Sequence, residues 1–213
     1  MSLKAVRLLK NSKEINSARK LLYKVYIEEL KWLFNPQSLT KFHIQQSSDG
    51  GKMLCDAFDQ DALWVGAYKD DKLVGTIRIV TRDNRLGKLD LELYDDKKMP
   101  SLAKIYTRCI EMQRSAVDKE YRGSRSMLPL LSLFTLEHAR QTNHGVCCTA
   151  NIKHIQNILH KAGFECLHSP FYYGEGKDEK PSIVMFCPQN RVARAIEVAR
   201  DLVGSANHEQ ELY

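Results

Sequence analysis

Hydrophobic and polar positions repeat along this chain with two periods, one typical of helices and one typical of strands. Residues 12–32 place apolar side chains near every 3.6 positions, which predicts an amphipathic helix with Ser12 as its N-cap. Residues 62–82 contain two apolar runs rich in β-branched side chains, joined at Lys69 to Lys72, which predicts a β-hairpin. Residues 4–10 predict a short strand before the first helix.

The second half of the chain alternates between the same two patterns. Residues 108–117 and 145–150 predict core strands, and residues 127–142 predict a helix that is apolar nearly all round and therefore buried. Pro129 is compatible with this helix, because a proline in the first turn removes only an N–H without a helical partner. Further elements are predicted at 152–163 (helix), 164–173 and 182–187 (a pair of strands) and 190–203 (amphipathic helix).

Two regions have little periodicity. Residues 33–54 are polar and contain Gly50 and Gly51, which predicts a long irregular loop, whereas residues 88–93 favour a further strand. The mixture of elements predicts an α/β (α+β) fold in one domain, residues 1–213, with a mixed central sheet and helices on both faces. Such a fold does not by itself specify a function.

Composition limits the class of protein but not its activity. Hydrophobic residues make up 43% and charged residues 27% of the 213 positions, as in an average globular chain, and no apolar run approaches the ~20 residues of a membrane span. The N-terminus lacks the pattern of a secretory signal, so we expect a cytoplasmic location. The six cysteines form no CxxC pair and the histidines show no metal spacing, so we expect reduced thiols and no metal.

The net charge of +6 includes a dense set of basic residues between Lys4 and Lys31. A solvated helix face is the simplest interpretation, and attraction of an acidic partner protein or a phosphorylated cofactor is the second. We expect no binding of nucleic acid, because no zinc-finger or aromatic RNA-binding motif accompanies the charge.

Residues 117–131 combine a strand end, a basic turn with a glycine, and a helix start. The unpaired N–H groups of a first helical turn and the helix dipole favour an anion there, and Arg122 and Arg125 add positive charge. An ordinary β-to-α turn is the alternative. The arrangement resembles the acyl-CoA site of the GCN5-related N-acetyltransferase fold, although Arg125 and Met127 replace two glycines of that pattern. The resemblance implies an acetyltransferase-like fold and a phosphopantetheine site at Val117, Arg122, Gly123, Ser124, Arg125 and Ser126.

Four further stretches sharpen the resemblance: "LYKVYIEELKW" (22–32), "DAFDQDALW" (56–64), "GTIR" (75–78) and "EMQRSAV" (111–117). Their order and spacing resemble the N-acyl-homoserine lactone synthases and the long-chain N-acyl amino acid synthases, a branch of the same fold. The resemblance runs from about residue 7 to residue 190. Leu22 stands where lactone synthases usually have an arginine, and Gln113 where they have a serine.

The resemblance implies an N-acyltransferase that moves a medium or long acyl chain to the amine of an amino acid or similar small molecule. The donor would be a thioester of acyl carrier protein or coenzyme A, used as cosubstrate, with no permanently bound cofactor. A lactone (autoinducer) synthase that uses S-adenosylmethionine as acceptor is one alternative. A protein of the same fold that binds an acyl ligand or a partner protein without catalysis is another. The apolar residues 125–134 would suit a fatty-acyl tunnel, although such residues also form ordinary cores.

Acyl transfer to an amine needs a deprotonated acceptor and a polarised carbonyl. On the matched motifs, Glu111 is the candidate general base, with Arg114 beside it, and we expect Glu111 to open into a solvent-reachable crevice. A backbone N–H of the same strand would polarise the carbonyl. Strict alternation would send Glu111 and Arg114 to opposite faces, so we predict either a β-bulge between them or two different roles.

The same motifs predict an acceptor pocket. Asp56 and Asp59 would hold the acceptor's ammonium or orient Arg78, with Tyr26 and Trp32 as walls. In the alternative interpretation, the charges of Asp56, Asp59, Arg78, Glu111 and Arg114 form a buried ion network that only neutralises itself. The two interpretations are compatible, because charges gathered at one site shift one another's pKa values.

Overall fold

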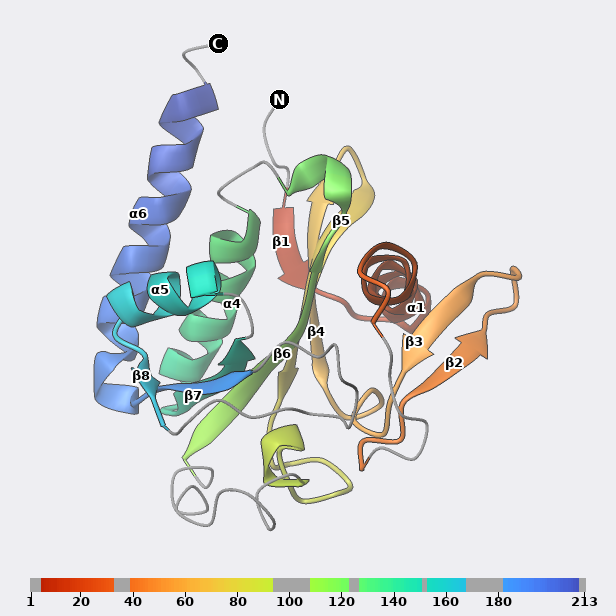
Figure 1. Cartoon of the computed structure of the whole chain (residues 1–213), viewed down its shortest axis with the longest axis horizontal. Helices are drawn as coiled ribbons and strands as arrows, with labels where there is room; N and C mark the ends of the chain where they lie inside the picture. The colour runs from red at the N-terminus through yellow and green to blue at the C-terminus, as the bar shows by residue number, and fades with distance from the viewer. Residues whose placement is uncertain are drawn as a thin grey trace.

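A seven-stranded mixed sheet forms the centre of the computed structural model, which describes residues 5–32, 39–93, 108–122, 127–150, 153–167 and 182–210. The strand order is β1-β4-β5-β6-β7-β9-β8. Figure 1 shows α4, α5 and α6 on one face of this sheet and α1 on the other. The predicted class, a mixed sheet with helices on both faces, is therefore confirmed.

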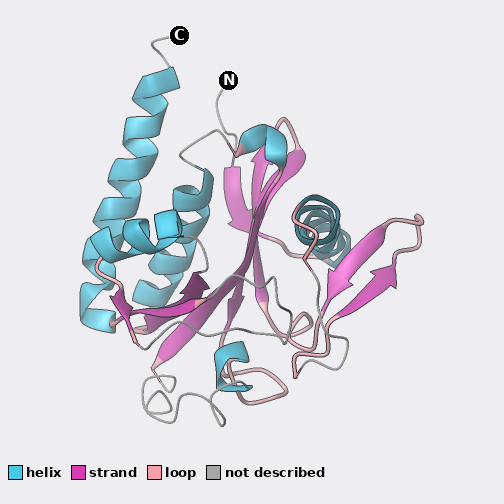
Figure 2. Cartoon of the chain, in the orientation of Figure 1, coloured by secondary structure: helices cyan, strands magenta, loops and turns pink. Residues whose placement is uncertain are grey.

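The strands of this sheet pair antiparallel, with one exception. Their bounds are β1 Ala5–Leu8, β4 Leu63–Lys69, β5 Lys72–Val80, β6 Cys109–Val117, β7 Gly145–Ala150, β8 Glu165–Cys166 and β9 Ile183–Cys187. Only β6 and β7 pair in parallel. A separate hairpin, β2 (His43–Gln46) and β3 (Lys52–Cys55), lies beside α1 (Figure 2).

The longer α-helices that accompany the sheet are α1 Ser12–Leu22, α4 Met127–Gln141, α5 Lys153–Lys161 and α6 Val192–Gln210, and residues 90–93 form a further helical turn. α1 continues directly into a π-helix, Tyr23–Glu29, a rare form that often marks functional sites. Short 3₁₀ turns cover Lys119–Tyr121 and Gln189–Arg191.

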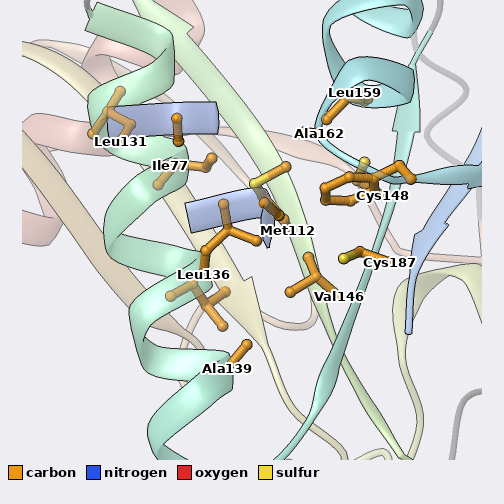
Figure 3. Packing of buried hydrophobic residues seen from close by; sticks show 14 of the residues in the cluster. Ile77, Met112, Leu131, Leu136, Ala139, Val146, Cys148, Leu159, Ala162 and Cys187 are labelled. Atoms are coloured by element: carbon orange, nitrogen blue, oxygen red, sulfur yellow. The ribbon is translucent and has the colours of Figure 1, made fainter. Parts of the chain in front are cut away.

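The larger hydrophobic core lies between the sheet and α4. Figure 3 shows Leu131 and Leu136 of α4 beside Ile77, Met112 and Val146, which come from three adjacent strands. Side chains alternate along a strand, so the residues next to these positions point to the opposite face of the sheet, toward α1. Arg78, next to Ile77, and Glu111, next to Met112, are two of them. The sheet thus has an apolar face under α4 and a second face that carries charges.

The predicted hairpin at 62–82 is confirmed, and its turn explains the tight connection. Asp70 and Asp71 have positive φ angles of 49° and 63°, the conformation that a two-residue hairpin turn requires. The predicted helix at 127–142 and the strand at 108–117 are also confirmed. All six cysteines lie in described residues as free thiols, and only Cys166 is exposed.

Three predictions of local structure are wrong. Residues 33–54 were expected to be irregular, yet they contain β2 and most of β3; β2 is exposed at every position, so no apolar alternation reveals it. The strand expected at 88–93 is instead a helical turn, Asp90–Leu93, because the Glu92 carboxylate accepts the Leu89 N–H at 2.7 Å. The N-cap of α1 is Asn11 rather than Ser12, since the Asn11 side chain accepts the Glu14 N–H at 3.0 Å.

Within the ranges given above, the structure contains no helix both long enough and apolar enough to cross a bilayer.

Candidate active site

The register of the sheet sets two rows of side chains on the face toward α1. In one row, Trp64 of β4, Arg78 of β5 and Gln113 of β6 are direct partners. In the next row, Glu111 of β6 lies between Val80 and Cys147. Arg78 and Glu111 therefore reach the same face from neighbouring strands, in the middle of the sheet.

Arg78 is the centre of a buried ion network, and its side chain is 1% exposed. Its two terminal nitrogens donate to the Asp56 carboxylate at 2.6 and 2.7 Å, a bidentate pair, and Nη1 also donates to Asp59. Nη2 donates to the Gln113 Oε1 at 2.7 Å. Arg19 of α1 pairs with Asp59 through its Nε at 3.1 Å. The structure thus brings together the predicted residues Asp56, Asp59 and Arg78.

The network shifts the pKa values of Asp56 and Asp59 in opposite directions. Burial alone would raise the pKa of Asp56, but the guanidiniums of Arg78 and Arg114 outweigh it and hold this pKa at about 2. Burial raises the pKa of Asp59, because the attraction of Arg78 does not fully offset desolvation and the repulsion of Asp56. Asp56 is therefore the firmly ionised partner of the two.

Arg114 joins this face because of a β-bulge, one of the two alternatives predicted. Two residues of β6, Arg114 and Ser115, stand opposite Ile77 of β5, and Arg114 has a φ of 53°. A left-handed conformation costs a non-glycine residue about 1–3 kcal/mol, so the contacts around it must maintain it. These contacts join the Arg114 guanidinium to Asp56 Oδ2 at 3.2 Å, to Asp90 Oδ2 at 3.3 Å and to the Phe42 ring at 4.2 Å.

Glu111 lies in the interior, so the expectation that it opens into a solvent-reachable crevice is wrong. The residue is 1% exposed, and its Oε2 accepts the Leu91 N–H at 3.2 Å. The burial follows from the helical turn Asp90–Leu93, which packs beside the charged row of β6. A surface cavity of about 340 Å³, lined by Arg7 and Tyr68 among others, does not reach Glu111.

Burial gives the Glu111 carboxyl unusual acid–base properties. Desolvation, followed by the repulsion of Asp90, raises the pKa of Glu111 well above its ordinary value, and the Leu91 N–H and the two arginines oppose this only in part. Burial likewise raises the pKa of Asp90, against the attraction of Arg114. Carboxyls with raised pKa values can hold a proton near neutral pH, which is one requirement of general acid–base chemistry.

Aromatic rings border the charged cluster where the π-helix ends. The rings of Tyr26 and Trp32 lie edge to face with centroids 5.2 Å apart, and Trp32 packs in the same way on Phe42 at 5.3 Å. The Tyr26 hydroxyl donates to the Ser115 carbonyl at 3.1 Å. Tyr26 therefore lies beside the charged cluster, as predicted, and also contacts the bulge through Ser115.

Replacing Tyr26 with phenylalanine is expected to lower, several-fold, the turnover of the acyl transfer that the sequence motifs imply, and to change the free energy of unfolding by only about 1 kcal/mol, the usual contribution of one hydrogen bond. The reason is that the hydroxyl holds the Ser115 peptide in the bulge, whereas the ring packing survives the change. Turnover and urea unfolding of the same preparation check this. Tyr23→Phe, on the same π-helix, is the matched control, and equal turnover in the two variants would contradict the role given to Tyr26.

Toward the predicted donor residues, β6 and β7 separate within their own lengths. They pair from Cys109–Gly145 to Met112–Cys148, whereas β6 continues to Val117 and β7 to Ala150. The predicted donor residue Val117 lies at the far end of this separation, and its carbonyl accepts the Arg122 Nε at 2.8 Å. Arg122 also pairs with Glu29 of the π-helix. The remaining predicted donor residues, Gly123, Ser124, Arg125 and Ser126, lie outside the described residues.

Sequence reasoning missed four residues of this cluster: Arg19, Asp90, Gln113 and Phe42. Gln113 could have been found, because it lies two positions from Glu111 and therefore on the same face of β6. Asp90 could not, because residues 88–93 were assigned to a strand rather than to the helical turn that brings Asp90 to Arg114. Phe42 carries no motif and precedes a strand that is exposed throughout.

Comparisons with known proteins identify the family and the fold of the chain. A family model described as "N-acyl amino acid synthase FeeM" matches residues 17–187 of the chain. The structure of FeeM, an N-acyl amino acid synthase from uncultured soil microbes, superposes with a TM-score of 0.66 at 18% identity, covering 93% of this chain and 98% of FeeM. The CoA-dependent acyl-homoserine lactone synthase MesI gives a TM-score of 0.62 at 18% identity, covering 94% and 95% of the two chains. At these identities the two structures establish the fold alone.

A curated relative is similar over part of its length. The L-ornithine N(alpha)-acyltransferase of Agrobacterium fabrum (strain C58 / ATCC 33970) is 24% identical over 123 residues, which are 57% of this chain. The match spans 41% of that relative's own length.

Proposed function

The chain belongs to the N-acyl amino acid synthase family that the FeeM model describes, and from that premise we propose that it is an N-acyltransferase. It moves a medium or long acyl chain from a thioester of acyl carrier protein or coenzyme A to the amine of an amino acid or a similar small molecule. Membership of this family confirms the resemblance that the sequence motifs carry.

One observation carries the proposal. A buried carboxyl pair, Glu111 and Asp90, lies beside two arginines and a β-bulge on the strand that parts from its parallel neighbour after Met112. This combination supplies a proton acceptor, fixed charge and backbone N–H groups released from strand pairing. A network that served stability alone would not need the bulge and its left-handed arginine.

The mechanism follows from these positions. The acceptor's ammonium loses a proton to Glu111, and because this carboxyl is buried, the proton passes through Asp90 or one water molecule. The neutral nitrogen then attacks the thioester carbonyl carbon, and the carbonyl oxygen takes the negative charge. A backbone N–H freed at the bulge donates to that oxygen. The intermediate collapses as the C–S bond breaks, and the nitrogen gives up its second proton to the departing thiolate, so that the thiol leaves and the amide remains.

The ion pair between Arg122 and Glu29 would affect binding of the acyl donor. A donor phosphate that binds Arg122 must compete with Glu29, which already occupies that guanidinium. MesI is a CoA-dependent synthase, which supports coenzyme A as one carrier, whereas the basic residues of α1 would suit an acidic carrier protein. We propose that either thioester can deliver the chain and that their relative efficiency is set at this turn.

Incubation of the purified protein with decanoyl-CoA or decanoyl-acyl carrier protein tests the function. The acceptors are the standard L-amino acids, L-ornithine and S-adenosylmethionine, each assayed for free thiol and, by mass spectrometry, for the acylated product. An N-decanoyl amino acid formed in equal amount to the thiol is expected. A product only with S-adenosylmethionine, accompanied by methylthioadenosine, would favour the lactone synthase. No thiol release with any pair would favour a non-catalytic binder.

A further inference from the structure

Gln113 leaves one buried hydrogen-bond donor unused. The residue is 8% exposed, and its Oε1 accepts from Arg78, a side chain that can only donate. That contact fixes the orientation of the amide, so Nε2 is the free end, and it has no partner among the described residues. A buried donor without a partner is costly, which makes this atom a candidate for contact with a ligand.

Asp90 leaves one buried acceptor unused in the same cluster. It is 3% exposed, and its Oδ2 accepts from Arg114 at 3.3 Å, whereas Oδ1 has no partner in the described part of the chain. Gln113 and Asp90 are linked through the same ions, because Arg78 and Arg114 both bind Asp56. One unused donor and one unused acceptor therefore belong to the same buried ion network.

The charges of the cluster do not balance. Within the described residues it contains three guanidiniums, Arg19, Arg78 and Arg114, against four carboxyls, Asp56, Asp59, Asp90 and Glu111. The two aspartates of the 56–59 turn are occupied by Arg19, Arg78 and Arg114. When all four carboxyls are ionised, the surplus negative charge therefore lies at Asp90 and Glu111, where either a retained proton or a bound cation would compensate it.

We propose that Gln113 and Asp90 determine the acceptor specificity of the proposed N-acyltransferase by recognising the two ends of an amino-acid zwitterion. Asp90 Oδ1 accepts from the acceptor's ammonium, which supplies the missing positive charge and lies beside Glu111. Gln113 Nε2 donates to the carboxylate of the same molecule. The inference rests on the proposed function and adds to it the two side chains that distinguish an amino acid from a simple amine.

Gln113→Glu tests the carboxylate contact. The variant keeps an oxygen for Arg78 and replaces the free N–H₂ with a second oxygen, which repels a carboxylate but accepts from a carboxamide. The acceptors are the L-amino acid with the highest kcat/KM in the panel above and its primary amide. The ratio of kcat/KM for acid over amide should fall at least about tenfold in the variant. General damage to the fold would lower both values and leave the ratio unchanged.

Gln189→Glu, an exposed glutamine whose Nε2 donates to Asn143, is the matched control and should keep the wild-type ratio. An unchanged ratio in Gln113→Glu would overturn the role of Gln113. Equal use of acid and amide by the wild-type protein would overturn it as well. If the wild-type protein acylates no acceptor at all, the proposed function itself has failed, so the two failures are distinguishable.

Asp90→Asn tests the ammonium contact independently. The variant keeps an oxygen for Arg114 and leaves three guanidiniums facing three carboxyls, so its melting temperature should be equal to or higher than that of the wild type. Its KM for the amino acid should nevertheless rise at least about tenfold, because an N–H₂ now faces the ammonium. Asp61→Asn, in the exposed pair with Arg85, is the control for KM. A lower melting temperature with an unchanged KM would show a purely structural role and overturn the assignment of Asp90.

Discussion

Arg78→Met is expected to reduce the free energy of unfolding by about 3–5 kcal/mol, the usual effect of removing one partner from a buried ion pair. Arg78 is 1% exposed and neutralises Asp56 and Asp59, so the variant leaves two buried carboxyls facing each other with less positive charge. Methionine fills much of the space of the arginine stem, so the loss reflects charge more than a cavity. Urea unfolding at pH 7, followed by circular dichroism, measures it.

The pH dependence of this loss identifies its cause. Asp56 has a folded-state pKa of about 2, below its ordinary 3.8, so it stabilises the fold above pH 3.8 and that stabilisation is lost as the pH falls toward 2. Without Arg78, burial would raise this pKa, and the carboxyl would be protonated in mild acid. The difference between wild type and variant should therefore shrink as the pH falls from about 7 to about 4.

Arg85→Met is the matched control, because Arg85 pairs with Asp61 at 2.9 Å but is 60% exposed. An exposed pair contributes about 0–1 kcal/mol, so this variant should unfold almost as the wild type does. A loss of similar size in both variants, or a loss at Arg78 that does not vary with pH, would contradict the central place of Arg78 in the network.

Glu111→Gln is expected to reduce acyl-transfer turnover ~10²-fold or more while the protein remains folded. Glutamine keeps the shape of the side chain and an oxygen for the Leu91 N–H, but it cannot take a proton from the acceptor. Wild-type turnover should rise with pH through the raised pKa of Glu111, because only the ionised carboxylate is a base, and the variant should lose this rise. Turnover at saturating acceptor between about pH 5 and pH 9 measures both effects.

The stability of this variant should change in the direction opposite to its activity. The folded-state pKa of Glu111 is raised, so its favourable contribution is complete below its ordinary pKa of 4.5 and is lost as the pH rises through the raised value. Glutamine does not ionise, so the variant does not lose stability in this way, and above neutral pH it should be at least as stable as the wild type. Glu165→Gln, on β8 in an exposed pair with Arg191, is the control for both measurements. A wild-type rate in Glu111→Gln would exclude Glu111 as the base.

The sequence predicted the central strands and helices because their apolar side chains repeat with a clear period. It also predicted the five charged residues of the site, Asp56, Asp59, Arg78, Glu111 and Arg114, from the order of four short motifs. The structure gathers these five on one face of the sheet. The bulge was predicted because the motif places Glu111 and Arg114 at one site, whereas residues three apart on a regular strand point to opposite faces.

The features that the sequence did not predict depend on contacts between distant residues, which leave no local pattern in the sequence. β2 and β3 pair with each other beside α1, where exposed polar residues give no alternation. The turn Asp90–Leu93 is closed by a side-chain contact of Glu92, and it both buries Glu111 and adds Asp90 to the cluster. The expectation of an open Glu111 was wrong for this reason. Arg122 was predicted from its position in a basic turn, but its pairing with Glu29 depends on the π-helix lying nearby.

We propose that the buried carboxyl of Glu111 removes the acceptor's proton during acyl transfer. The most direct measurement compares single-turnover transfer from decanoyl-CoA by wild type and Glu111→Gln, first to the preferred amino acid and then to aminooxyacetate, whose amine is already neutral at pH 7. If Glu111 is the base, the variant should show a large defect with the amino acid and a much smaller one with aminooxyacetate. An equal defect with both acceptors would contradict it, because the loss would then not concern the proton.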